Sequence, residues 1–384
     1  MKKALVVFLI LAVAGGLFAQ TSWSGSVSTG FGIGFDDNDD SKPLVDYIRD
    51  RGDQGLRADV NFNYTGGGPD KDGNPNPYGS WGAGLGVRGQ VDKFATSTYE
   101  ISINGGSVWW QPNSLVYLAI GTGANKDVYA TPGGLGFKQS IHDANGLKLH
   151  LTPMAGLSIG AHAFYGNVGA LKNFEDMNYG LGVNYTATGL LNVVANFRYK
   201  PEQTDNKFDV GAGANFLGLS SVGLTKLAAD VGTYNFGDNS KFFIGIGESI
   251  TFKALENLLT LDLAGQQFIW AGDDEKDFIP MRYRFGLSYT IDKIVPAIQF
   301  QYSMGRTPAY NYRNANEVGG LGAVENFDNK GKAALGVSPQ VTFNFGPTLV
   351  LGYNLQMDMS DDKPSTATGK TMQHLIYATI NIGF

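Results

Sequence analysis

Residues 22–35 read SWSGSVSTGFGIGF, and this stretch alternates between two kinds of residue. The odd positions from Trp23 onward are Trp, Gly, Val, Thr, Phe, Ile and Phe, whereas every even position is Ser or Gly. A period of two places successive side chains on opposite faces of a β-strand. One face of this strand is therefore mainly apolar, and the other carries only small residues and hydroxyl groups.

The same alternation returns along the whole chain. In GLRADVNFNY (residues 55–64), five apolar residues face away from Arg57, Asp59 and two asparagines, and RYRFGLSY (residues 282–289) repeats the pattern with Arg282 and Arg284. The pattern predicts about eighteen strands, most of them near the roughly 9–11 residues that a tilted strand needs to cross a bilayer. The region between residues 65 and 97 fits least well, so sixteen strands remain an alternative. The predicted spans are 22–35, 55–65, 81–91, 98–110, 114–122, 144–152, 156–165, 177–187, 190–200, 207–216, 222–232, 241–252, 257–269, 281–291, 295–305, 332–345, 348–358 and 371–384.

The predicted connections alternate between short and long. This alternation is typical of outer-membrane barrels, which have short periplasmic turns and longer outer loops. The first long connection is acidic, and we expect it to be a solvated outer loop with a short helix at 43–51. The short connections are 111–114, 152–156, 186–189, 292–293 and 346–347, and the long ones are 36–54, 123–143, 166–176, 270–280, 306–331 and 359–370.

The polar faces favour a membrane barrel over a soluble β-sandwich. They carry mostly Gly, Ser, Asn and Thr, whereas a solvated outer face is usually richer in Lys and Glu. Aromatic residues such as Trp23, Trp81, Trp109 and Tyr185 fall near strand ends on the apolar face, where rings settle at headgroup level. We therefore predict an all-β fold, a transmembrane antiparallel up-and-down β-barrel.

The first nineteen residues have the three parts of a secretory signal peptide. Lys2 and Lys3 precede an apolar run at 4–13, which is too short for a membrane anchor, and small residues follow it. We predict cleavage after Ala19, which leaves residues 20–384 as a single barrel domain.

Composition and motifs disfavour several other classes of protein. The 384 residues include 53 glycines and no cysteine, and the net charge is −6, so nothing favours binding to nucleic acid or thiol chemistry. Asp70, Asp72 and Asn74 have calcium-ligand spacing but lack the bidentate Glu that completes an EF-hand loop. The four histidines show no metal-ligand spacing. We therefore predict no enzyme activity, no cofactor and no metal.

The C-terminal stretch HLIYATINIGF (residues 374–384) places Ile380, Ile382 and Phe384 on one face. A terminal Phe after such an alternation resembles the assembly signal of bacterial outer-membrane barrels. In pattern the chain resembles a porin or porin-like protein over nearly its whole length, and its Gly-rich style resembles that of spirochaetal outer-membrane proteins. The resemblance implies the outer membrane of a diderm bacterium, with its lipid and the barrel-assembly machinery as partners. It also implies passive diffusion of small hydrophilic solutes and ions, and a homotrimer.

Strand parity nominates inward-facing charges as pore-lining candidates. Basic and acidic candidates nearly balance, so the ion preference stays open. A substrate-selective channel, for example for sugars, is one alternative and needs inward aromatics, for which Trp110, Tyr117 and Tyr377 are candidates. A surface adhesin with a closed lumen is another, with 306–331 as its longest loop. The pore-lining candidates are Arg57, Asp59, Arg88, Lys148, Arg198, Asp209, Asp262, Arg282 and Arg284.

In many porins the third outer loop folds inward and constricts the pore. Here that loop is 123–143, and Asp127 and Lys138 are its candidate constriction residues. Pro-Gly-Gly at 132–134 favours tight turns with a small profile. The loop lacks the acidic tip residue of the general-porin motif, so an ordinary surface loop remains the alternative.

Overall fold

The described part of the chain consists mainly of β-strands. The computed structural model describes residues 20–36, 44–46, 54–68, 72–92, 98–121, 130–135, 146–164, 177–199, 208–236, 243–270, 279–304, 333–359 and 372–384. The predicted signal peptide, residues 1–19, lies outside these ranges. Within them, no helix is long and apolar enough to cross a membrane.

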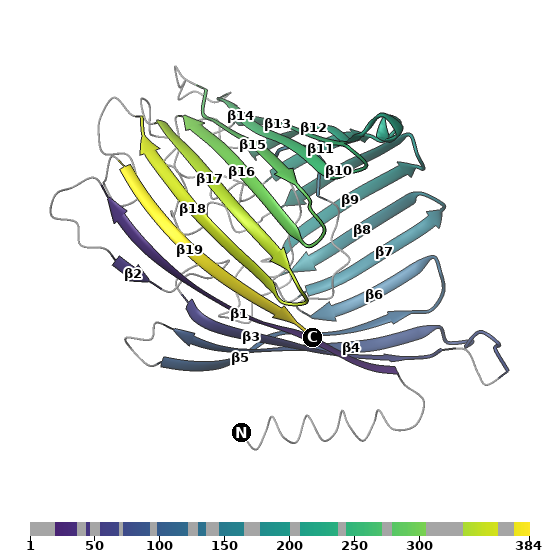
Figure 1. Cartoon of the computed structure of the whole chain (residues 1–384). Coiled ribbons are helices and arrows are strands. Elements are labelled where there is room, and N and C mark those ends of the chain that lie inside the picture. The colour runs from purple at the N-terminus through teal and green to yellow at the C-terminus, as the bar shows by residue number, and fades with distance from the viewer. Residues whose placement is uncertain are drawn as a thin grey trace.

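One antiparallel sheet contains every strand, and it closes on itself (Figure 1). All strands except the three-residue β2 form the wall of an 18-strand barrel. The predicted fold class is confirmed, and the sixteen-strand alternative is wrong. Every predicted span overlaps one strand, and the largest error is four residues, at the end of β12. The strands are β1 (Gln20–Asp36), β2 (Leu44–Asp46), β3 (Gln54–Gly66), β4 (Ser80–Asp92), β5 (Thr98–Gln111), β6 (Val116–Gly121), β7 (Gly146–Met154), β8 (Leu157–Phe164), β9 (Asn178–Ala187), β10 (Leu191–Tyr199), β11 (Phe208–Phe216), β12 (Leu224–Phe236), β13 (Phe243–Ala254), β14 (Leu259–Trp270), β15 (Met281–Tyr289), β16 (Ile294–Met304), β17 (Ala333–Asn344), β18 (Thr348–Asp358) and β19 (Met372–Gly383).

The barrel closes where the first strand pairs with the last. The register runs from Ser26↔Gly383 to Asp36↔Gln373. Beyond the strand end, Gly25 N donates to Phe384 O at 2.8 Å, and Phe384 N donates back to Gly25 O at 2.9 Å. Closure pairs the edges of β1 and β19, which satisfies the condition for a sheet in a bilayer.

The register keeps one polar face and one apolar face around the wall. Directly paired residues share a face, so the alternation can be followed from strand to strand. The outward positions are apolar and exposed, as at Ile101 and Ile376, whereas the buried positions are largely polar, as at Asp209 and Ser303. The polar face therefore lines the inside of the barrel.

Strand β5 contains a bulge that reverses its alternation. Gly86 pairs with Gly105 but Val87 pairs with Ile103, so Asn104 is left without a direct partner. Extra residues of this kind are typical of β-bulges. Odd residues face outward before the bulge and even residues after it. The interpretation of Trp109 as outward and Trp110 as inward was therefore wrong, and the two indoles occupy the opposite faces.

The connections follow the expected alternation, except that residues 67–79 form a longer connection at the end where the other turns are short. Short turns join the strands at one end, for example at residues 155–156 and 345–347, where Gly156 (φ 78°) and Gly346 (φ 106°) adopt the left-handed backbone that glycine favours. A single-turn 3₁₀ helix, η2 (Ser220–Val222), lies in another turn. The short helix predicted at 43–51 is wrong over Leu44–Asp46, because those residues form β2 beside Gly32–Gly34 of β1.

Candidate functional site

All nine predicted pore-lining charges fall on the inward face of the wall. The direct pairs show this placement. Asp59 pairs with Arg88, Lys148 with His162, and Arg198 with Asp209. Asp262, Arg282 and Arg284 lie on the same face of β14 and β15. The described strands thus bring the candidates to one enclosed surface.

Two ion-paired groups lie on separate parts of the inner wall. On β3 and β4, Asp59 forms ion pairs with both Arg57 and Arg88, and it accepts a hydrogen bond from Arg88 Nε at 2.7 Å. On β10 and β11, Arg198 donates to Asp209, whose residue is only 1% exposed. Asp209 is buried, so loss of Arg198 would leave the carboxylate charge less well compensated. These acids are therefore held in place by neighbouring arginines.

A third group extends over β12, β14 and β15. Lys226 lies within electrostatic reach of Asp230, Asp262 and Arg284. Asp262 also accepts a hydrogen bond from Thr251 Oγ1 at 2.7 Å. This part of the wall therefore carries charges of both signs side by side.

The connection between β6 and β7 reaches this third group. Of that connection, residues 130–135 are described, and they lie against the inner faces of β11–β14. Thr131 Oγ1 donates to Asp230 Oδ2 at 2.6 Å, and Leu135 N donates to Asp230 Oδ1 at 3.1 Å. Gln266 Nε2 donates to Gly134 O at 2.8 Å. We name residues 130–135 the inward segment.

Glycine makes the close approach of the inward segment possible. A Cβ on Gly133 would overlap the Asp230 carboxylate, and one on Gly134 would overlap the Gly265 backbone oxygen. On the wall, a Cβ on Gly247 would overlap both Asp230 and Leu135 N. The inward segment and the inner face of the wall therefore both need glycine at their contact.

The inward segment lies on the inner wall rather than on the outer surface. Leu135 is fully buried and Thr131 nearly so. The predicted constriction residues Asp127 and Lys138 lie outside the described residues. The sequence did not indicate that Thr131 would bind the inner wall. It did indicate, through Pro132-Gly-Gly, that this part of the connection makes tight turns and takes little space.

Four rings follow one another across the inner faces of β5–β8. Trp109 stacks on Tyr117 with centroids 5.9 Å apart, Tyr117 meets His150 edge-on at 6.1 Å, and His150 stacks on His162 at 5.8 Å. The expected inward position of Tyr117 is correct. Tyr377 also lies inward, on β19, where it packs with Leu375. The row occupies one sector of the wall.

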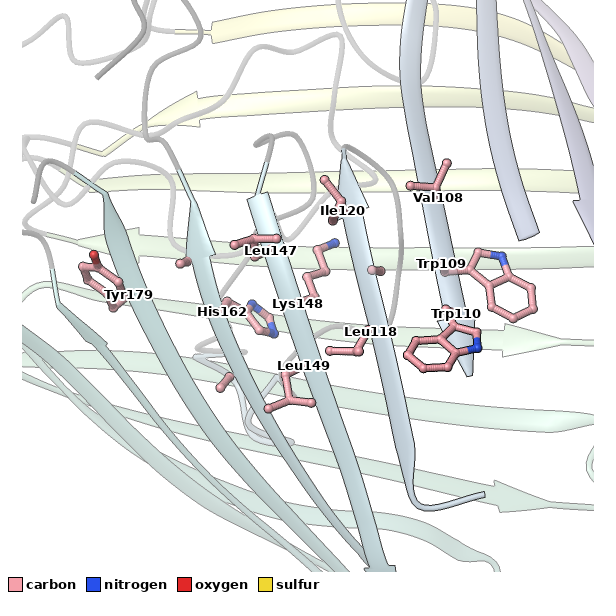
Figure 2. A pocket seen from close by; sticks show the side chains of 13 residues that line it. Val108, Trp109, Trp110, Leu118, Ile120, Leu147, Lys148, Leu149, His162 and Tyr179 are labelled. Atoms are coloured by element: carbon pink, nitrogen blue, oxygen red, sulfur yellow. The ribbon is translucent and has the colours of Figure 1, made fainter. Parts of the chain in front are cut away.

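A separate apolar hollow of about 690 Å³ lies across β5–β9 (Figure 2). Most of its lining residues occupy outward positions, including Trp110, Leu118, Leu147 and Tyr179. The hollow thus belongs to the outside of the barrel and is distinct from the polar lumen. Over the described ranges, no group of three or more His, Asp or Glu side chains is placed to hold a metal ion.

Comparison with known proteins gives similarity in fold only. No family model and no curated protein matches the chain. Its fold is similar to that of the outer membrane protein OprD from Pseudomonas aeruginosa (TM-score 0.56, 12% identity, 96% of this chain and 94% of that chain). The chain has the fold of an outer-membrane barrel. Two further similar structures are Pseudomonas aeruginosa OpdQ (TM-score 0.56, 8% identity, 95% and 98% covered) and Acinetobacter baumannii OccAB3 (TM-score 0.55, 8% identity, 95% and 100% covered).

Proposed function

We propose that the protein is an outer-membrane channel for passive diffusion of small hydrophilic solutes and ions. One observation carries the proposal: a closed wall separates an apolar outer face from an inner face lined with charged and polar side chains. Hydrocarbon cannot hydrogen-bond with backbone groups, and a closed barrel leaves none of its wall unpaired. Barrels with this many strands are wide enough for an aqueous channel. The similar fold of OprD, described as an outer membrane protein, supports the location.

The inward segment is the proposed constriction. It occupies the inner face over β11–β14 and therefore narrows the lumen from that side. Arg282 and Arg284 lie on the adjacent strand β15. Arg282 is almost fully buried, so a solute that passes the segment meets the partly exposed Arg284. We include Asp127 and Lys138 in the same proposal, because the connection that contains them also contains the segment.

A sugar-selective channel and an adhesin, the two alternative functions, would each require a different lumen. A sugar-selective channel needs a continuous aromatic track, and the row of four rings is confined to β5–β8 with both histidines buried. An adhesin with a closed lumen would not require a charged inner wall. Assembly by the barrel-assembly machinery and a homotrimer remain proposals that rest on the resemblance to porins.

Single-channel conductance tests the proposal directly. The chain from Gln20 to Phe384 is refolded, inserted into a planar bilayer and recorded at several salt concentrations. We expect ohmic steps whose size rises in proportion to salt, as an aqueous pore requires. Insertion is verified separately by β circular dichroism and heat-modifiable migration. A chain that inserts but produces no steps contradicts the channel and favours a filled lumen.

A further inference from the structure

The outward positions of the described strands carry a single formal charge. Among the outward positions of the described strands, every residue is apolar or uncharged except Glu248 of β13. Glu248 is the sixth residue of this twelve-residue strand, so it lies near mid-height of the wall. Charged side chains on the lipid face of a barrel are destabilising, most of all near the bilayer midplane.

Glu248 belongs to a small polar network built by three neighbouring strands. Its direct partners are Ala229 on β12 and Gly265 on β14, and Gly265 pairs in turn with Tyr283 on β15. The Tyr283 hydroxyl donates to the Glu248 carboxylate and accepts from Gln267 Nε2. We name these five residues the Glu248 patch.

Glycine at position 265 allows this network to form. A Cβ on Gly265 would overlap the Glu248 carboxylate and the Tyr283 ring. The Glu248 carboxylate therefore lies over the Gly265 backbone, beside the Tyr283 ring. Around it the outward side chains are apolar and exposed, as at Val231, Ile246 and Leu263.

Lipid alone satisfies this network poorly. A carboxylate offers about four acceptor positions, and the Tyr283 hydroxyl provides a single donor to it. Acyl chains have no hydrogen-bonding groups, and headgroups lie toward the ends of the strands rather than at mid-height. The occupant of this surface must therefore bring polar groups into the hydrocarbon layer at the same depth.

We propose that the Glu248 patch is the interface through which a second copy of this chain binds. A second copy presents the same patch at the same depth, and the patch holds both donors (the Gln267 amide) and acceptors (the Glu248 carboxylate). A surface of this kind is self-complementary across a two-fold axis, so this contact gives a dimer in place of the homotrimer that the resemblance to porins implies. Small outward residues on the neighbouring strands, Ala229, Ala212 and Ala214, allow two walls to approach closely, as small residues do in membrane interfaces. The inference rests on the proposed membrane location and is independent of conduction.

Cysteine cross-linking tests the contact. The chain has no cysteine, so one substitution creates a unique thiol. Ala229→Cys lies beside Glu248 in the proposed interface. Ile103→Cys is the matched control, because it is also outward and the sixth residue of its strand, but on β5, far around the wall. In liposomes treated with oxidant we expect a disulfide-linked dimer from Ala229→Cys and at least tenfold less from Ile103→Cys. Equal cross-linking at both positions would overturn the proposal.

A substitution of Glu248 tests the cause of the association. In the Ala229→Cys background, Glu248→Leu should reduce the linked dimer at least tenfold, and Glu248→Gln, which keeps hydrogen-bonding groups, should reduce it less. Heat-modifiable migration and protection from protease verify that each variant is inserted. An inserted Glu248→Leu variant that still dimerises fully, or a native chain that stays monomeric in liposomes, contradicts the interface. Neither result affects the conductance steps, which test the channel alone.

Discussion

At the scale of single residues, Asp230 connects two parts of the molecule that are far apart in sequence. Its carboxylate accepts from Thr131 Oγ1 and from Leu135 N, across 99 and 95 residues of chain. Hydrogen bonds to charged groups each contribute about 1.5–3 kcal/mol. Gly247 and Gly213 leave the space in which the segment and the carboxylate meet. The position of the inward segment therefore depends strongly on this one side chain.

Replacing Asp230 with Ala should loosen the inward segment. Both hydrogen bonds to the carboxylate are lost, and only the bond from Gln266 to Gly134 among those described still attaches the segment. We expect a larger single-channel conductance with more current noise. Asp262→Ala is the control, since it removes the same charge from the same wall but has its hydrogen bond with Thr251. Equal changes in both variants would mean that charge, rather than the segment, controls the current.

At the scale of elements, the bulge in β5 shows where sequence periodicity stops being informative. Alternation predicts which face a residue occupies only while every residue of the strand is paired. Ile101 and Ile103 set the outward parity of β5, and the extra residue Asn104 reverses it before Trp109. Asn104-Gly105-Gly106 are residue types that favour a bulge, but glycine is so frequent along this chain that the run does not mark the position by itself. Both indoles are therefore misplaced by parity, although the bounds of β5 are predicted to within one residue.

Fluorescence quenching by brominated lipids tests the reversed parity. Trp110 faces outward and is 46% exposed, and its indole donates to Tyr78 O in the nearby turn. Trp109 faces inward and stacks on Tyr117. Each is one of five tryptophans. Trp110→Phe should therefore remove a clear share of the quenchable emission, and Trp109→Phe almost none. The reverse order would contradict the bulge.

At the scale of the whole molecule, the sequence predicts the wall well and the interior poorly. A barrel wall repeats one local rule, so alternation and turn residues are sufficient to locate its strands and to place Arg198 and Asp209 on the inner face. The anchoring of Thr131 on Asp230 depends on which strands come to face each other across the lumen. No local sequence pattern specifies which strands face the inward segment. In the same way, no local pattern indicates that the Glu248 and Tyr283 side chains meet over Gly265.

Closure of the barrel provides the last prediction, which concerns Phe384. Its backbone bonds to Gly25, and its ring lies 5.5 Å from that of Trp23. If the terminal Phe is an assembly signal, Phe384→Ala should insert poorly in cells but refold in detergent almost as well as the native chain. Trp23→Ala removes the same ring contact and keeps the C-terminal sequence, so it should insert normally.

The comparison separates recognition from local stability. Insertion is measured as the heat-modifiable fraction in outer membranes, and refolding as the same fraction after dilution from urea. If Phe384 acted only through its ring contact, Trp23→Ala and Phe384→Ala would have the same effect. Each variant would then lower the inserted fraction and the refolded fraction to the same extent as the other. A loss in cells confined to Phe384→Ala would mean that the terminal residue acts before the barrel closes, since the contact with Trp23 exists only once β1 and β19 are paired.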